Sequence, residues 1–325
     1  MATRSNPSRR LTLLVALMAA WVAGSTLGAV PAGRRAEAMP VFQIEQAHAE
    51  HVPVLDGSEP IFILFLGSDA RPGEDVTRLR ADSVHIVAIN LEEAKTTIVG
   101  FPRDALVPIP GFGTNKINAA MVNGGPELVV ETVEELTGIT MDYWALAGFQ
   151  GFQAMINQVG GLSMDVPFDV FDSAAGAAIE AGPQTLTGED ALAFARARKA
   201  LPSGDFGRSE NQGRLMIAAL DQFRREFASD PSRLLAWIGA GLRNAHTDVP
   251  LDQLMSLAFT ASTLNSKRVV NVVLPGGVSM NGEVSVVNLN QTVLDAISRD
   301  LADDGLLRRS NVPPSPNAGL LPTEQ

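Results

Sequence analysis

The sequence predicts an α/β domain in which helices pack on a central sheet, preceded by one membrane-spanning helix. Three observations lead to this prediction. Strand-like and helix-like patterns alternate from residue 60 to about 170, no change of composition divides residues 60–308, and an uncharged stretch runs from Leu11 to Val30. Alternation of this kind is typical of helices layered on a sheet. We therefore expect one folded domain over residues 60–308.

Short runs of apolar and β-branched residues predict the strands, because such runs fit a buried sheet. They cover residues 61–66, 83–89, 96–101, 143–147 and 162–168. Helical spacing of apolar residues predicts helices over 126–138 and 149–159, the first bounded by Pro126 and Gly138. A third helix is expected from Thr187 to Ala195, with Thr187 and Asp190 placed to cap its start.

The N-terminal region predicts attachment to a membrane. Residues 11–30 have the length of a bilayer-spanning helix, and the arginines before them favour a cytoplasmic N-terminus. We expect a short cytoplasmic segment (1–10), a single-pass signal anchor (11–30) and a linker (31–59). A cleaved signal peptide is the alternative, with cleavage near Ala38 or Ala49. Either reading places the domain outside the cytoplasm. Residues 309–325, rich in Pro, Asn and Ser, are expected to form a disordered tail.

Composition excludes several classes of function. The net charge is −11, which disfavours non-specific nucleic-acid binding. The chain has no cysteine, so disulfides, thiolate metal sites and cysteine nucleophiles are absent. His85 lies within an apolar run and is expected to be structural and not a general base.

Positive charge is distributed very unevenly. Between Ile117 and Ala195 there is no lysine or arginine, and clusters stand on either side of this gap. Arginine suits phosphate because its planar fork donates two parallel hydrogen bonds and keeps its charge. Two readings follow, an anion site or ordinary surface arginines paired with acids. The clusters contain Arg71, Arg78, Arg80, Arg103 and Lys116 before the gap, and Arg196, Arg198, Lys199, Arg208 and Arg214 after it.

Spacing narrows the choice between these two readings slightly. Arg196 and Arg198 share a face only if the chain is extended there, so the helix before them should end near Arg196. Arg208 and Gln212 share a face if they lie on a helix, although Gln212 could instead form a capping box with Ser209.

Two aspartates accompany these arginines, Asp69 after the first predicted strand and Asp82 before the second. An antiparallel or loop-bridged arrangement would bring them together. Two carboxylates beside bound phosphate are suitable ligands for Mg²⁺. Taken alone, aspartates at strand ends are also common turn and cap residues.

Six segments in order resemble motifs of the LytR-CpsA-Psr family, over roughly residues 60–216. One departure is Asn211, where many relatives have arginine, and another is Gly213, where a second glutamine is common. The segments are Leu66–Arg71, Arg80–Ser83, Phe101–Asp104, Lys116–Ala120 with Gly124–Pro126, Ala191–Arg198, and Asp205–Arg208 with Gln212.

The resemblance implies a three-layer α-β-α fold and a phosphotransferase that uses Mg²⁺, with Mn²⁺ as a possible substitute. It implies that a glycopolymer of the teichoic acid, capsular polysaccharide or arabinogalactan type is moved from polyprenyl pyrophosphate to peptidoglycan. By the same resemblance, Asp69 and Asp82 would hold the metal. The pyrophosphate would be bound by Arg80, Arg103, Lys116, Arg196, Arg198, Arg208 and Gln212, with Asp82, Arg103, Arg196 and Arg198 central to catalysis. A pyrophosphate phosphatase and a non-enzymatic envelope-binding protein are the alternatives.

Overall fold

The computed structural model describes residues 59–321, which lie within one compact unit. The predicted anchor (11–30) and all of the predicted linker (31–59) except Glu59 lie outside the described residues. Within residues 59–321 no helix is long and apolar enough to cross a membrane. The core is a six-stranded sheet in the order β11-β6-β1-β2-β3-β12. Its strands are β1 (Ile61–Ser68), β2 (Ala81–Asn90), β3 (Lys95–Gly100), β6 (Tyr143–Gly148), β11 (His246–Thr247) and β12 (Val269–Val273).

The sheet is mixed. β2 runs antiparallel to both β1 and β3, whereas β6 is parallel to β1 and β12 is parallel to β3. At one end of the β1–β2 pair, Ser68 lies opposite Ala81 and the Asp69 amide donates to the Arg80 carbonyl (3.2 Å). The antiparallel arrangement therefore brings Asp69 and Asp82 to the same edge of the sheet, one of the two arrangements that the sequence left open.

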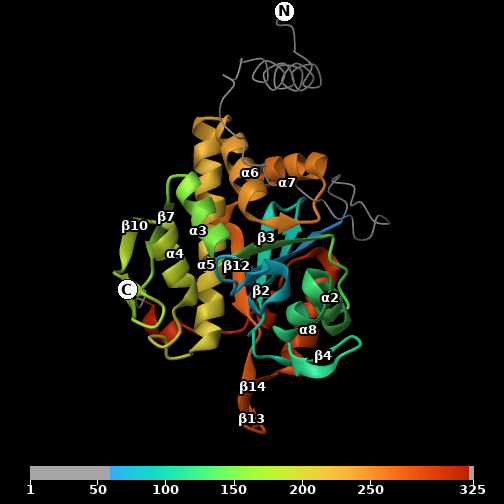
Figure 1. Cartoon of the computed structure of the whole chain (residues 1–325). Coiled ribbons are helices and arrows are strands. Elements are labelled where there is room, and N and C mark those ends of the chain that lie inside the picture. The colour runs from blue at the N-terminus through green and yellow to red at the C-terminus, as the bar shows by residue number, and fades with distance from the viewer. Residues whose placement is uncertain (1–58, 322–325) are drawn as a thin grey trace, which may run out of the picture. The chain divides into compact units, whose positions relative to one another are not determined.

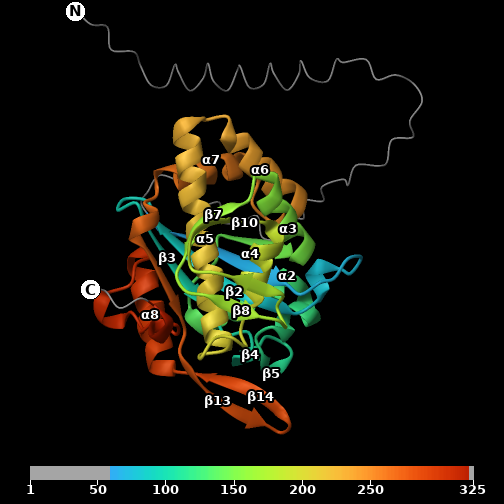
Figure 2. The same cartoon turned by 90° about the vertical axis from the view of Figure 1, so that its left-hand side faces the viewer.

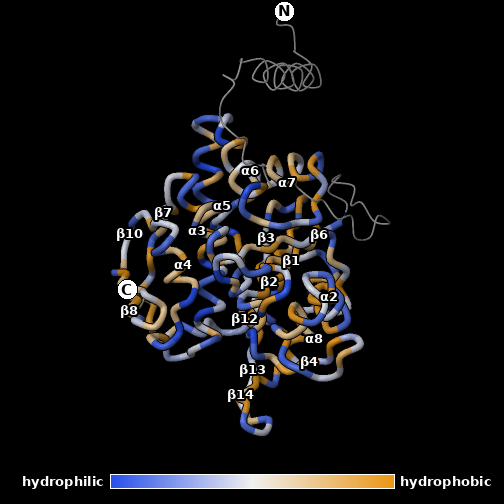
Figure 3. Tube along the Cα trace, in the orientation of Figure 1, coloured by the Kyte–Doolittle hydropathy of each residue, from blue (hydrophilic) through white to orange (hydrophobic). Residues whose placement is uncertain are grey.

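Helices cover both faces of the sheet and make three layers (Figure 1). Even-numbered residues of β1, such as Leu64, pack in a core with α2 and α8, while odd-numbered ones, such as Ile63, pack toward α7 and α5. Both faces are buried, which explains why β1 reads as an unbroken apolar run and not as an alternating one. Hydrophobic residues accordingly concentrate along the central strands (Figure 3). The helices are α2 (Ala119–Thr137), α3 (Phe149–Gln158), α4 (Gly188–Arg196), α5 (Asp205–Ser229), α6 (Arg233–Asn244), α7 (Leu251–Thr263) and α8 (Gln291–Asp304).

The predicted helix after Pro126 is the second part of a longer one. α2 begins at Ala119, and Gly125 interrupts it with a non-helical backbone (φ 79°, ψ −167°). Pro126 then starts the regular helix, which ends at Gly138 in the left-handed conformation. The start was missed because proline and glycine inside a helix normally signal a boundary.

Four two-stranded ribbons surround the main sheet. One of them, the β13–β14 hairpin, projects away from the sheet (Figure 2). The ribbons are β4 (Leu106–Ile109) with β5 (Gly113–Lys116), β7 (Leu162–Val166) with β10 (Gly182–Leu186), β8 (Val170–Asp172) with β9 (Ala177–Ile179), and β13 (Gly276–Asn281) with β14 (Val284–Leu289).

The prediction of a disordered tail is wrong for residues 309–321. This segment contains two short 3-10 helices, η3 (Arg309–Asn311) and η4 (Ala318–Leu320), and returns to pack against α5. Its Asn317 is 1% exposed and donates its backbone N–H to Glu210. Composition misled because the polar residues that suggested disorder are satisfied by buried polar partners. The last four residues of that prediction lie outside the described residues.

Candidate active site

Asp82 lies at the centre of the candidate site. It is the second residue of β2, and its side chain is 18% exposed. Its carboxylate accepts a hydrogen bond from Arg103 (Nη1 to Oδ1, 2.6 Å), and Arg208 Nη1 lies 3.8 Å from Oδ2. Its main-chain carbonyl accepts from Arg208 Nη2 (3.2 Å) and, at 3.5 Å, from Gln212 Nε2. One residue at the sheet edge thus orients three predicted phosphate ligands.

Arg103 follows β3, at the same edge as Asp82 because β2 and β3 are antiparallel. Its guanidinium also lies 3.6 Å from Asp205 and 3.8 Å from Asp104. Burial works against the Arg103 charge, but the carboxylates of Asp82, Asp205 and Asp104 together outweigh it, so the pKa of Arg103 is raised. The side chain keeps its full charge while remaining 19% exposed, which leaves it reachable by a ligand.

Arg208 and Gln212 project from one face of α5, as their spacing predicts. Gln212 also donates to the Ala195 carbonyl (3.1 Å), which ties α5 to the last turn of α4. The capping-box alternative for Gln212 is wrong, because Ser209 lies inside α5 and its hydroxyl contacts His85. Arg208 is 4% exposed, and burial lowers its pKa.

Asp205 is a site residue for which the sequence suggested no role. Its carboxylate lies 2.8 Å from Arg208 Nη2 and 3.6 Å from Arg103 Nε, so it stands between two like charges. The spacing could have predicted this contact, because an acidic residue three positions before Arg208 lies on the same face of a helix as Arg208. Asp205 and Asp82 together allow the two arginines to approach each other.

Arg196 is the last residue of α4, next to Ala195, whose carbonyl accepts from Gln212. The helix ends at Arg196 and Ala197 is extended (ψ 127°), as expected if Arg196 and Arg198 serve one pocket. The predicted cap is also present, with Thr187 and Asp190 forming a capping box. The Arg196 guanidinium lies over the Phe149 ring at 4.9 Å.

Arg198 is exposed but close to the centre of the site. Burial lowers the pKa of Arg208, and the Arg198 charge is among the neighbouring charges that lower it further. The main-chain N–H groups of Arg198 and Lys199 both donate to Asp172, which fixes the turn after α4.

Asp69 is a suitable metal ligand together with Asp82. Burial raises the pKa of the Asp69 carboxyl, the nearby Asp82 charge raises it further, and Arg80 opposes the rise. Two carboxylates that repel each other beside a group of arginines are a fitting donor set for Mg²⁺, which takes one or two carboxylates plus phosphate oxygens. Within residues 59–321 no cluster of three or more metal-binding side chains occurs, so phosphate or water would complete the shell.

Lys116 and His85 lie at the margin of the site. Lys116 donates to Asp104 (2.8 Å), which itself lies beside Arg103, so Lys116 acts on the site through a neighbour. His85 is fully buried between Ser83 and the Ser209 carbonyl, and burial lowers its pKa to about 4. A neutral, enclosed imidazole fits the structural role expected of it.

The two departures from the resembled motifs have local explanations. Asn211 points away from Asp82, toward the buried amide of Asn317 (3.4 Å). Gly213 lies against β12, where an added Cβ would stand 2.1 Å from the Asn271 side chain. Neither position faces the arginine cluster, so neither change removes a phosphate contact from it.

The comparisons with known proteins agree with this geometry. The model of the LytR_cpsA_psr family matches residues 33–303, a range that includes the whole arginine and aspartate cluster. The chain belongs to the LytR-CpsA-Psr family. The resemblance inferred from six motifs is therefore confirmed.

Two relatives from Bacillus subtilis (strain 168), TagV and TagT, are both named polyisoprenyl-teichoic acid–peptidoglycan teichoic acid transferases. TagV is 32% identical over 228 residues, which cover 67% of this chain and 57% of TagV. TagT is 31% identical over 258 residues, which cover 76% of this chain and 78% of TagT. The chain thus spans little more than half the length of TagV.

The fold is also that of a solved family member. The crystal structure of B. subtilis TagV aligns with a TM-score of 0.66 and 29% sequence identity, covering 77% of this chain and 98% of that structure. The predicted α/β class with helices packed on a central sheet is confirmed for the described residues.

Proposed function

We propose that this protein transfers a polyprenyl-pyrophosphate-linked anionic glycopolymer onto peptidoglycan. The observation that carries the proposal is that Arg103 and Arg208, from distant parts of the chain, both lie against the Asp82 carboxylate, with the Arg103 side chain still 19% exposed. The named activity of TagV and TagT supports the same reaction class. The polymer that we propose is of the teichoic acid, capsular polysaccharide or arabinogalactan type.

The charge of the site suits a pyrophosphate. Arg80, Arg103, Arg196, Arg198 and Arg208 outnumber the aspartates among them, so the cluster stays positive in a strongly acidic protein. Arg103 and Arg208 are held by Asp82 and Asp205 in fixed orientations. Fixed donors aimed at developing charge stabilise a phosphoryl-transfer transition state without reorganising during the reaction.

Mg²⁺, or Mn²⁺ in its place, would be held by Asp69 and Asp82. Such an ion supplies Lewis-acid polarisation of the phosphate oxygens and neutralises charge that develops on them. The raised pKa of Asp69, caused by burial and by the Asp82 charge, supports a cation at this edge of the sheet.

The reaction that we propose breaks the phosphoanhydride bond of the donor and forms a phosphodiester, with release of the proton of the attacking hydroxyl. A hydroxyl of the peptidoglycan glycan attacks the phosphorus that carries the polymer, and the bond to the second phosphate breaks. The lipid leaves as a monophosphate, and the product is a phosphodiester. Arg103 and Arg208 would stabilise charge on the transferred group, and Arg196 and Arg198 charge on the leaving phosphate. Gln212 would contribute a neutral donor.

A membrane location completes the proposal. A polyprenyl donor resides in the bilayer, and residues 11–30 are predicted to anchor the chain there with the domain outside the cytoplasm. The partners are then the lipid-linked glycan and peptidoglycan, and nucleic acid is not among them.

The test uses the full chain in detergent with a short polyprenyl-pyrophosphoryl disaccharide, Mg²⁺ and peptidoglycan fragments, and products are read by mass spectrometry. We expect a phosphodiester-linked product that disappears with a chelator, returns with Mg²⁺ and is absent in Asp82→Ala. Hydrolysis at full rate without acceptor would instead show a phosphatase. Tight lipid binding without turnover would show a binding protein.

A further inference from the structure

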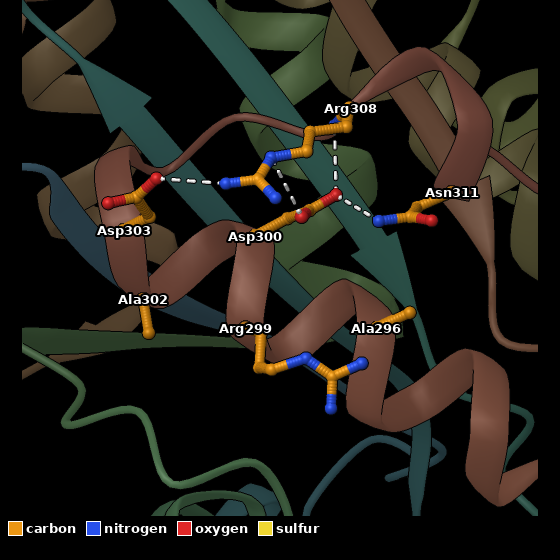
Figure 4. A pocket seen from close by; sticks show the side chains of 7 residues that line it. All are labelled: Ala296, Arg299, Asp300, Ala302, Asp303, Arg308 and Asn311. Carbon is orange, nitrogen blue, oxygen red and sulfur yellow. Dashed lines mark hydrogen bonds and ion pairs between the residues drawn. The ribbon is translucent and has the colours of Figure 1, made fainter.

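The chain after α8 connects two parts of the molecule. We call residues 308–321 the strap. At its start, Asp300 of α8 accepts from the Arg308 backbone N–H (2.9 Å) and from the Asn311 side chain (2.7 Å), as Figure 4 shows. Asp300 is 3% exposed, so this anchor is buried. The strap is thus fixed to the helix layer behind β2 before it crosses to α5.

At its other end the strap contacts the first two turns of α5. Glu210 accepts from the Ser315 hydroxyl (2.6 Å) and from the Asn317 backbone N–H (3.1 Å). The Asn317 side chain donates to the Gly207 carbonyl (3.1 Å) and to Asn211 (3.4 Å). Glu210, Asn211 and Asn317 are almost completely buried, so losing their hydrogen bonds would leave buried polar groups unsatisfied and destabilise the contact.

Gly207 permits this close contact. A Cβ at that position would lie 2.3 Å from the Asn317 side-chain oxygen, so only glycine allows the strap to pack this closely against the helix. Asn211 continues the same face and accepts from the strap, where an arginine would offer no acceptor. The strap and this face of α5 therefore fit each other in shape and in hydrogen bonding.

The face held by the strap differs from the face that carries the site. Arg208 and Gln212 face Asp82, whereas Gly207 and Glu210 face the strap. The start of α5 has no side-chain cap, because its N-cap residue is Gly204. The turn that carries Arg208 is thus fixed by hydrogen bonds from the strap and not by a side-chain cap of its own.

We propose that the strap is a positioning element of the active site, an inference that rests on the proposed function. It fixes the first turns of α5 so that Arg208 keeps its contacts with Asp82 and Asp205. Asn317 and Glu210 are its positioning residues, and they act through Arg208 without touching substrate.

The test compares Asn317→Ala with Arg308→Ala in the full chain. Asn317→Ala removes both side-chain bonds to α5, whereas Arg308→Ala removes a 70% exposed side chain and leaves the backbone anchor to Asp300. Affinity for inorganic pyrophosphate with Mg²⁺ is measured by calorimetry, together with hydrogen exchange of the first turns of α5. We expect Asn317→Ala to weaken pyrophosphate binding about tenfold and to speed that exchange, while Arg308→Ala resembles the wild type.

Three results would overturn the proposal that the strap positions Arg208. One is a lower melting temperature in Asn317→Ala with unchanged pyrophosphate affinity and unchanged α5 exchange. Another is equal weakening in both variants. The third is wild-type behaviour of Ser315→Ala in exchange, should Asn317→Ala fail to fold. If the wild type itself binds no pyrophosphate, the proposed function fails, and the exchange data still report whether the strap holds α5.

Discussion

Arg103→Ala removes the guanidinium that bonds Asp82 most closely. In the proposed reaction the lost donor would face the reacting phosphate, and losing one such preorganised donor typically costs about 10²–10³ in kcat. We therefore expect glycopolymer transfer to fall by about that factor. Arg103→Lys keeps a positive charge without the planar fork and should retain an intermediate rate.

The same change affects stability less than it affects transfer. Removing one member of a fully buried ion pair costs about 3–5 kcal/mol. The Arg103 and Asp82 side chains are 19% and 18% exposed, so water partly solvates the remaining carboxylate. Arg208 also stays within 3.8 Å of Asp82. We expect a loss of about 1–3 kcal/mol, which leaves a folded protein at the assay temperature.

The assay measures the phosphodiester-linked product by mass spectrometry, alongside a thermal melt. Arg225→Ala is the matched control, because it removes an arginine of α5 that is 60% exposed and paired to Asp221 away from the site. The reasoning is refuted if Arg103→Ala transfers within about threefold of the wild type, or if its loss of rate equals its loss of folded protein.

Three further predictions address neighbouring residues. Phe149→Leu removes the aromatic ring that lies under the Arg196 guanidinium. A cation–π contact at such a site contributes about 0.5–1 kcal/mol, so kcat/KM should fall about two- to fivefold. An unchanged kcat/KM would show that the ring does not position the arginine. The pKa of His85 falls from 6.5 to about 4 on folding because of burial, so the unfolded state binds more protons between these values and stability should decrease as pH falls through that window. His85→Gln should flatten this dependence in melts between pH 7 and 5, and an equal slope would contradict it. The pKa of Asp69 is raised first by burial and second by the Asp82 charge, and Asp82→Asn removes that charge. Carboxyl NMR of the Mg²⁺-free variant should therefore show a lower Asp69 pKa than in the wild type, and a higher one would contradict the reasoning.

Much of the catalytic face could be predicted from the sequence because it depends on local rules. The strand runs, the capped helix ending at Arg196 and the shared face of Arg208 and Gln212 all follow from periodicity and end signals within a few residues. The resemblance to a known family then supplied the roles, which spacing alone left open between an anion site and surface ion pairs.

What the sequence could not provide are contacts between distant segments. Asp205 contacts Arg103 only because α5 packs against the loop after β3, and no local sequence pattern predicts that packing. The packing of residues 309–321 was missed for a related reason: their Pro, Asn and Ser composition is that of a disordered chain, and only buried partners such as Glu210 and Asp300 make it ordered.

The meeting of β2 and α5 has a consequence for folding order. The bonds from Arg208 and Gln212 to Asp82 span 126 and 130 residues of chain. Contacts of such high sequence separation form late in folding, because the entropy of closing a long loop is lost before the contacts stabilise the chain. A growing chain therefore carries its aspartates for a long interval without an arginine pocket around them. In the proposed function, the ability to hold a pyrophosphate would appear only when α5 docks on β2.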